Sequence, residues 1–442
     1  MSMRESESAG GRATGDRPEG ATIRHVAAMP FPARLGTQAY IQATAEGQLA
    51  AGDKVKVLTY ARGAGASAID AVLERPANFT PEATPRPGPT LGKLRDDFVL
   101  WRALRHVPPA TQTLAHHLEA CLICALTAHR PFTYVAHTCL EEELPTYLPT
   151  WVRQQANRTL DKARLRNLFR QPARLFCRSL IGTVAQLGGG LDTIALRLAD
   201  ECKAVSPALG HRLGIPALAL PDWPPPSEQR AAQGGADNHR RDAEDPTAAP
   251  TKRQVARTSL ALPPSAPLLA YFGNLDGYQG AEVLSEVIGQ LPTAWSLLLM
   301  TDSPPPAWAN DHPQRVFYRR LTTMRRRALG YAAADVVIVT RECGAGIPIK
   351  LLDALAQGMP VVAQARALAG FTELAQLDGS NLTVVAHSTP RSFFASDAKS
   401  PSQESAKALA AATLKAFRER PPQERPEGSQ GQSELQGGDA SR

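Results

Sequence analysis

The chain has 442 residues and is mildly basic, with 49 Lys and Arg against 42 Asp and Glu and a formal net charge of +7. At roughly 100–200 residues per domain, this length predicts two domains, and 43% apolar residues suffice for buried cores. The 37 Pro and 33 Gly follow no period, which excludes a collagen-like fibre. No run of about 18 apolar residues exists, which excludes a membrane-spanning helix. The small net charge is weak evidence for nucleic-acid binding, and no nucleic-acid motif is present.

Cysteine usage and the first residues predict a cytoplasmic protein. Six cysteines in so long a chain do not make a disulfide framework. Residues 1–20 are polar and Gly-rich, unlike a secretory signal. Segments that are poor in large apolar residues cannot offset their ordering entropy, so we expect disorder in them. They are residues 1–21, the linker 224–258 and the tail 420–442.

The first ordered half, 22–223, predicts a Rossmann-like domain. A short apolar strand, a glycine-containing loop, a helix and a second strand form a unit typical of parallel pairing. The expected strands are Ile23–Met29, Lys54–Thr59, Thr133–Ala136 and Glu201–Val205, and the expected helices are Gln38–Ala50 and Gln112–Ala128.

The second half, 259–385, repeats this alternation, and a helix is expected within 386–419. Continuous Val, Ile and Leu runs between helices indicate a sheet covered on both faces. We therefore expect an α/β fold of two doubly wound parallel sheets, with a ligand cleft at the carboxyl ends of the strands. The expected strands here are Leu268–Phe272, Ser296–Met300, Val316–Tyr318, Asp335–Val339 and Pro360–Ala363, with helices at Ala281–Gln290, Thr323–Ala333 and Ile349–Gln357.

Residues 340–363 join a strand end to a glycine-rich loop and a helix start. Gly344 and Gly346 allow backbone N–H groups to approach an anion, and Pro348 suits the first helical turn. The helix N-terminus carries partial positive charge, and Lys350 adds a full charge. Asp353 follows on the same face, where it can accept hydrogen bonds from sugar hydroxyls. A tight connection without any ligand is the alternative for the loop alone.

The segment LLDALAQGMPVV (351–362) resembles the nucleotide-sugar loop of GT-B glycosyltransferases of family 4, the glycosyltransferase group 1 superfamily. The resemblance extends in order along most of the chain, from about Ile23 to Leu382. It implies two facing Rossmann-like domains, an acceptor-binding one and a nucleotide-sugar-binding one. The other similar stretches are Met29–Gln42, Cys202–Leu213, Leu268–Gly280 and Ala332–Val339.

The sequence departs from the family pattern at several charged positions. Asp353 replaces the second Glu, which in the family binds the nucleotide ribose, and Ala345 replaces the first. Asn274 and Gln279 stand where many members have an Arg and a Lys that hold the pyrophosphate. The resemblance then implies that Lys350 holds the diphosphate, with Arg319, Arg320 or Arg341 assisting. The implied donor-binding set is Gly36, Gly273, Asn274, Gln279, Gly344, Ala345, Gly346, Ile347, Lys350 and Asp353, and the catalytic set is His137, Lys350 and Asp353.

The histidines cluster in the first half. His137 follows a short strand, and a family histidine near this point contacts the donor sugar; a structural strand-end histidine is the alternative. His116 or His117 could contribute as well. The His116–Glu119 spacing lacks a third ligand, so no metal is expected. Cys121 and Cys124 form a CxxC within an apolar stretch and are expected to be buried small hydrophobes.

The segment 151–178 is strongly basic, with eight cations against Asp161 and apolar residues at helical spacing. Such a helix can lie on an anionic membrane surface, here the inner face of the membrane. Alternatively, its basic face is solvated and its apolar side packs on the sheet. Taken together, the residues and the resemblance predict a retaining, metal-independent glycosyltransferase of cell-envelope or polysaccharide synthesis, with no cofactor beyond its nucleotide-sugar donor. The acceptor is a glycan, lipid-linked or small-molecule hydroxyl. A silent sugar-nucleotide-binding scaffold and a GT-B epimerase are the alternatives.

Overall fold

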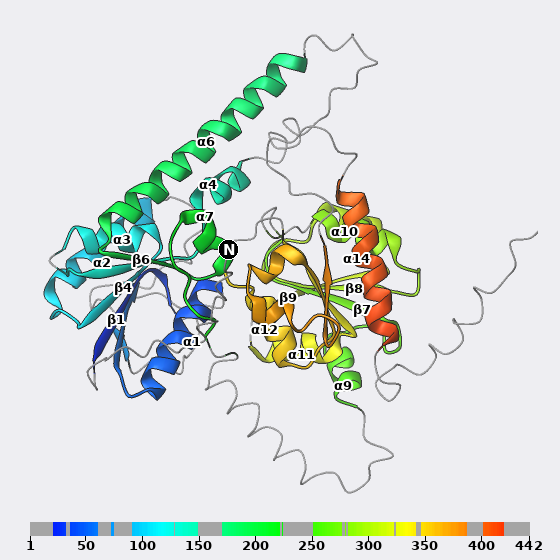
Figure 1. The fold of residues 1–442 in the computed structure, drawn as a ribbon. Helices are drawn as coiled ribbons and strands as arrows, with labels where there is room; N and C mark the ends of the chain where they lie inside the picture. The colour runs from blue at the N-terminus through cyan, green and yellow to red at the C-terminus, as the bar shows by residue number, and fades with distance from the viewer. Residues whose placement is uncertain are drawn as a thin grey trace, which may run out of the picture.

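The structure, a computed structural model, describes residues 21–31, 36–60, 72–74, 91–127, 129–148, 170–221, 223, 251–275, 279, 282–321, 324–341, 346–386 and 401–419. They form two α/β domains side by side (Figure 1), each built on a six-stranded parallel sheet. The predicted pair of doubly wound parallel sheets is therefore confirmed. The predicted disorder of 1–20, 224–250 and 420–442 lies outside the described residues.

The N-terminal sheet has the strand order β3-β2-β1-β4-β5-β6, with its first strand at the centre. In this order the connections reverse direction between β1 and β4, so a crevice opens at their carboxyl ends. The strands are β1 (Thr22–Pro30), β2 (Lys54–Tyr60), β3 (Leu73–Glu74), β4 (Gln112–His116), β5 (Phe132–Ala136) and β6 (Glu201–Ala204). The helices of this half are α1 (Gly36–Ala50), α2 (Leu91–His106), α3 (His117–Ala125), α4 (Leu140–Glu143), η2 (Leu144–Tyr147), α6 (Arg170–Leu198) and α7 (Pro207–Leu213).

The C-terminal sheet has the equivalent order, β12-β11-β10-β7-β8-β9, and reverses between β7 and β10. Its strands are β7 (Leu268–Phe272), β8 (Ser296–Thr301), β9 (Val316–Arg320), β10 (Val336–Val339), β11 (Val361–Gln364) and β12 (Leu382–Val385). Its helices are α9 (Lys252–Ser259), α10 (Glu282–Gln290), η5 (Ala307–Asp311), α11 (Met324–Ala333), α12 (Ile349–Ala356), η6 (Ala365–Leu368), α13 (Thr372–Ala375) and α14 (Pro401–Arg418).

The helix predicted over Gln112–Ala128 is wrong in its first five residues, which form β4. Thr113 and Ala115 are buried between the neighbouring strands β1 and β5. The turn into α3 occurs at His117, whose φ of 68° is the left-handed conformation. This break is invisible in the apolar pattern, because a buried parallel strand and the helix that follows it are both continuously apolar.

Residues 252–258 belong to helix α9 rather than to a disordered linker, which corrects the predicted extent of the linker. Thr251 and Gln254 form a capping box at the start of α9. The side chain of Arg257 is only 1% exposed, and it pairs with Asp335 at 2.8 Å while donating to the carbonyl of Ala333. A buried ion pair between two segments fixes the helix against β10, and composition alone does not reveal such a pair.

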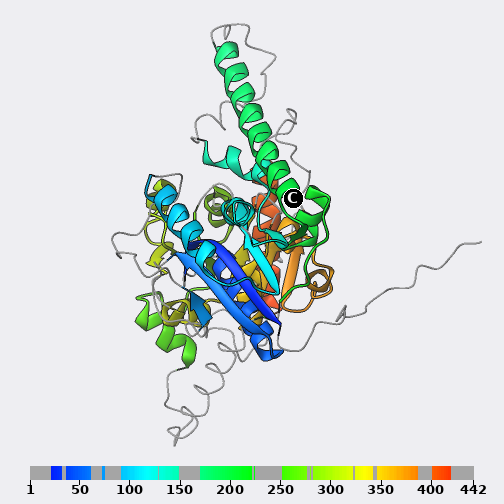
Figure 2. The same cartoon turned by 90° about the vertical axis from the view of Figure 1, so that its left-hand side faces the viewer.

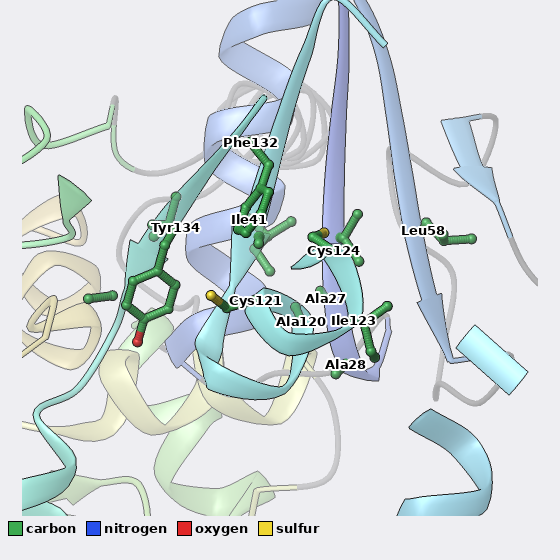
Figure 3. Packing of buried hydrophobic residues seen from close by; sticks show 14 of the residues in the cluster. Ala27, Ala28, Ile41, Leu58, Ala120, Cys121, Ile123, Cys124, Phe132 and Tyr134 are labelled. Atoms are coloured by element: carbon green, nitrogen blue, oxygen red, sulfur yellow. The ribbon is translucent and has the colours of Figure 1, made fainter. Parts of the chain in front are cut away.

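Figure 3 shows the N-terminal core, in which Ile41 of α1 and Phe132 and Tyr134 of β5 pack with the two cysteines of α3. Cys121 and Cys124 are fully buried, and burial raises the pKa of each thiol to about 12. They behave as small apolar side chains, as the sequence predicts.

Helix α6 is long and projects well beyond the N-terminal domain (Figures 1 and 2). Its inner face packs on α4 at Gly188, where an added Cβ would come within 2.3 Å of the Leu140 carbonyl oxygen. Its outer face exposes Phe176, Leu187 and Ile194, which are 63%, 61% and 47% accessible. Residues 151–169 of the predicted basic helix lie outside the described residues. No helix in the described ranges is long and apolar enough to cross a membrane.

Candidate active site

A cavity of about 330 Å³ lies between the two domains, at the carboxyl ends of both sheets. The domains approach each other there, because α1 contacts α12 and an added Cβ on Gly36 would lie 3.6 Å from Cγ1 of Ile349. The N-terminal domain contributes mainly Met29, Gly36, Thr37, Tyr40, His117 and His137, and the C-terminal domain contributes Gln279, Arg341, Gly346 and Ile347. The cavity therefore occupies the crevice that the strand order of each sheet predicts.

Positive potential converges on this cavity from helix ends and from one side chain. Helices α1 and α12 both begin beside it, and neither carries an acidic residue in its first turn. The partial positive charge at such helix starts favours anions, although in α12 the N–H groups of Ile349 and Leu351 already donate to the carbonyls of Ile347 and Pro348. Among the described lining residues, Arg341 carries the full positive charge. Its Nη1 donates to the carbonyl of Gly346 at 3.1 Å, which places the guanidinium beside the glycine-rich loop.

Lys350 lies next to the cavity, at the carboxyl end of β7. Its Nζ donates to the hydroxyl of Tyr271 at 3.1 Å and lies 4.4 Å from the centre of that ring. Gly273 makes this position possible, because an added Cβ there would lie 3.1 Å from Nζ. The Tyr271 hydroxyl in turn donates to the carbonyl of Asn274 at 2.6 Å. The described cavity lining does not include Lys350, which is therefore a neighbour of the site in this structure.

Asp353 is buried behind the cavity and is already engaged by protein groups. Its Oδ1 accepts from the indole Nε1 of Trp223 at 2.9 Å, and its Oδ2 pairs with Arg327 of α11. Burial raises the pKa of this carboxyl, although Arg327 acts in the opposite direction. The ribose role that the resemblance implies for Asp353 stays a prediction.

The remaining predicted donor residues divide into two groups. Gln279, Gly346, Ile347 and Gly36 all line the cavity. Gly344 and Ala345 lie outside the described residues. Two of the three candidate arginines do not line the cavity. Arg319 donates hydrogen bonds to the backbone carbonyls of Leu260, Tyr318 and Ala261. Arg320 is exposed to solvent.

His137 lies on the opposite wall, contributed by the N-terminal domain. Its ring stacks on His117 at a centroid distance of 4.7 Å and meets the edge of Tyr40 at 5.2 Å. His117 is held by Thr37, with 3.0 Å between Nε2 and Oγ1. Burial lowers the pKa of His137 well below its ordinary value and lowers that of His117 too, so both rings are neutral near pH 7.

Gln38 is a lining residue that sequence reasoning missed. Its Nε2 donates to the carbonyl of Pro30 at 3.4 Å, whereas its buried Oε1 has no hydrogen-bond partner in the described structure. A buried, unsatisfied amide oxygen is costly unless a ligand or water donates to it. In the sequence, only the position of Gln38 in the first turn of the helix after the N-terminal glycine loop could have indicated that it lines the site.

His116 and Glu119, the pair considered for a metal, have other partners. Both ring nitrogens of His116 bond to neighbouring histidines, and Glu119 pairs with Lys93 at 2.7 Å. Within the described ranges, no group of three or more His, Cys, Asp or Glu residues is placed to hold a metal ion.

Comparisons with known proteins identify a family match in the C-terminal part of the chain and solved structures of similar fold. Residues 266–396 match the family model described as "Glycosyl transferases group 1". No curated protein matches the chain in sequence. Among solved structures, the chain is similar to HepE of Anabaena in complex with UDP and glucose, at 16% identity and a TM-score of 0.52, covering 90% of this chain and 95% of that one.

Two further structures are similar to the chain in fold. WaaG, a glycosyltransferase involved in lipopolysaccharide biosynthesis, is similar at 14% identity and a TM-score of 0.52, covering 90% of this chain and 94% of that one. The catalytic domain of starch synthase IV from Arabidopsis thaliana, bound to ADP and acarbose, is similar at 12% identity and a TM-score of 0.51, covering 90% and 99%. The fold is therefore GT-B. This fold and the family match in the C-terminal domain together support a glycosyltransferase.

Proposed function

We propose that the protein transfers a glycosyl unit from a nucleoside-diphosphate sugar to an acceptor hydroxyl, as a family 4 enzyme. The observation that carries the proposal is the interdomain cavity, where two helix N-termini and Arg341 meet beside Gly346. The leaving diphosphate gains negative charge in the transition state, and fixed positive groups stabilise that charge without reorganising. These groups also supply the charge that a metal ion would otherwise provide, which supports a metal-independent reaction.

The donor sugar then faces the N-terminal wall of the cavity. His137 and Oε1 of Gln38, which has no partner among the described residues, can accept hydrogen bonds from sugar hydroxyls at this wall. Retention of the anomeric configuration is what family 4 membership implies. The relatives HepE and starch synthase IV were solved with UDP and ADP, so uridine and adenosine donors are the first to test.

The test is a turnover assay with UDP-, GDP- and ADP-glucose, each offered with and without acceptor sugars. We expect release of the nucleoside diphosphate from one donor, a loss of at least about 10-fold in kcat/KM in Arg341→Gln, and a loss in Lys350→Ala as well. Arg197→Gln, which removes an exposed charge of α6, is the matched control. Turnover unchanged in Arg341→Gln would refute the proposed site.

A silent sugar-nucleotide-binding scaffold is the second candidate, favoured by one observation. The carboxylate of Asp353 is buried and already engaged by Trp223 and Arg327, so a ribose would share it with these groups. The same assay separates the two candidates, since binding of a nucleoside diphosphate without any turnover would favour the scaffold. An epimerase would interconvert the sugar of the donor without transferring it.

A role in cell-envelope or polysaccharide synthesis, with contact to the inner membrane surface through 151–178, is the remaining part of the proposal. The outer face of α6 supports it: Phe176, Leu187 and Ile194 are spaced by 11 and 7 residues, which places them on one side of the helix. An apolar stripe beside a basic segment fits an anionic lipid surface. We expect Leu187→Asp to abolish co-flotation with anionic liposomes at low salt. The control Val255→Asp, at an exposed position of α9, should not.

A further inference from the structure

A line of buried side chains extends from the cavity into the N-terminal domain. His137 Nε2 lies 2.9 Å from His116 Nδ1, and His116 Nε2 lies 2.9 Å from His25 Nδ1. His25 Nε2 lies 2.7 Å from Oε1 of Gln48. The three histidines are buried, and they come from three adjacent parallel strands or the residue just beyond one. We name this series the histidine chain: Gln48, His25, His116 and His137.

The histidine chain has a direction because its three rings are neutral near pH 7: burial lowers the pKa of His25 to about 4 and those of His116 and His137 well below 6.5. A neutral imidazole has one donor nitrogen and one acceptor nitrogen. Since an amide oxygen can only accept, His25 donates from Nε2 to Gln48 and accepts at Nδ1 from His116. By the same rule, His116 accepts at Nδ1 from Nε2 of His137. The Nδ1 atom of His137, a residue that lines the cavity, is then the acceptor nitrogen of its ring.

We propose that Gln48, His25 and His116 are positioning residues that fix the tautomer of His137, so that its Nδ1 accepts a hydrogen bond from a hydroxyl of the bound ligand. The stack on His117 and the edge contact with Tyr40 hold the plane of the ring. The histidine chain determines which ring nitrogen of His137 carries the proton. The effect on transfer rests on the proposed function, whereas the tautomer itself does not.

Gln48 sets the direction of the hydrogen bonds in the histidine chain, although it lies far from the cavity. It lies 12 residues after Gly36 in α1, which is about 18 Å along the helix axis at 1.5 Å per residue. A donor at position 48 would favour the opposite direction in every link. His137 would then present Nδ1–H to the cavity instead of a lone pair. A substitution far from the ligand is therefore predicted to reverse a hydrogen bond at the ligand.

The experiment compares wild type, Gln48→Glu and Gln48→Lys by long-range proton–nitrogen correlation spectra of protein labelled with nitrogen-15 in histidine. We expect Nδ1 of His137 to be unprotonated in wild type and in Gln48→Glu, which keeps an acceptor, and protonated in Gln48→Lys. Gln42→Lys, which adds the same charge to α1, should leave the tautomer unchanged. The dispersion of the backbone amide resonances of each variant, compared with wild type, reports that the fold is retained.

Transfer activity is the second readout. We expect kcat/KM to fall at least about 10-fold in Gln48→Lys and to stay within about 3-fold in Gln48→Glu and Gln42→Lys. An unprotonated Nδ1 of His137 in folded Gln48→Lys, or a protonated one in wild type, would overturn the inference. Absence of turnover in all four proteins, together with the expected tautomers, would instead count against the proposed function.

Discussion

Acidification is predicted to destabilise the N-terminal domain through its buried histidines. Burial lowers the pKa of His25 to about 4, and it lowers the pKa values of His116 and His137 well below the ordinary value of 6.5. In the unfolded chain these rings are expected to titrate near 6.5. Below that pH the unfolded state binds more protons than the folded state. The stabilisation is therefore complete above about pH 7.5 and is lost as the pH falls toward 4.

The magnitude follows from these values. A histidine with a folded pKa near 4 and an unfolded pKa near 6.5 contributes about 1.3 kcal/mol less to the free energy of unfolding at pH 5.5 than at pH 7.5. Burial shifts the pKa values of His116 and His137 in the same direction, so they add to the decrease that His25 causes. Burial raises the pKa values of the Asp192 and Asp353 carboxyls, and shifts of that sign act in the opposite direction.

The contribution of His25 is obtained by comparing wild type with a variant that lacks this histidine. Urea unfolding of wild type and of His25→Gln is measured at pH 7.5 and at pH 5.5. The decrease in the free energy of unfolding over this range should be smaller in His25→Gln by about 1 kcal/mol or more. His106→Gln, at an exposed position of α2, should reproduce the wild-type decrease. An identical decrease in wild type and His25→Gln would refute the argument that His25 is buried and neutral.

Two further predictions concern packing. In α6, Gly188→Ala should lower stability by about 1–3 kcal/mol, because the new Cβ would meet the Leu140 carbonyl oxygen, whereas Gly182→Ala points into open space and should raise stability by about 0.5–1 kcal/mol. Thermal unfolding of both variants checks this, and equal changes in stability for Gly188→Ala and Gly182→Ala would contradict the contact between α6 and α4. Asp335→Asn should cost about 3–5 kcal/mol, since it leaves the Arg257 guanidinium buried without its carboxylate. Chemical denaturation checks this, and a loss under about 1 kcal/mol would show that Arg257 finds another partner or reaches water.

The strand pattern could be predicted because it depends on local composition. Runs such as Leu268–Phe272 and Val336–Val339 are short, apolar and followed by glycine or polar residues, and the structure has strands there. The division of Gln112–Ala125 into a strand and a helix could not be predicted, since both parts are apolar. The turn depends on His117 taking a left-handed conformation, which tertiary contacts impose.

The site was predictable at the level of loops and less so at the level of side chains. Gly36 and His137 follow strands, so their place at the cavity follows from topology. The direction of α12 decides that Lys350 reaches Tyr271 and that Asp353 faces Arg327 and Trp223. These partners are 26 to 130 residues away in sequence, and only the packed fold brings them together.

The histidine chain lay beyond sequence analysis for a related reason. His25, His116 and His137 are far apart in the sequence, and their contacts require β4 to lie between β1 and β5. Strand order in a parallel sheet is set by crossovers rather than by the residues of the strands themselves. The link to Gln48 further depends on how α1 packs against the sheet.

The central claim is that a diphosphate binds between the domains, at Arg341 and the two helix starts. Calorimetric titration of UDP, GDP and ADP into wild type, Arg341→Gln and Arg197→Gln tests it most directly. We predict that one of the three binds wild type and Arg197→Gln equally, and binds Arg341→Gln at least about 10-fold more weakly, since a charge-assisted hydrogen bond contributes about 1.5–3 kcal/mol. Equal affinity of all three proteins for that nucleotide would contradict the claim.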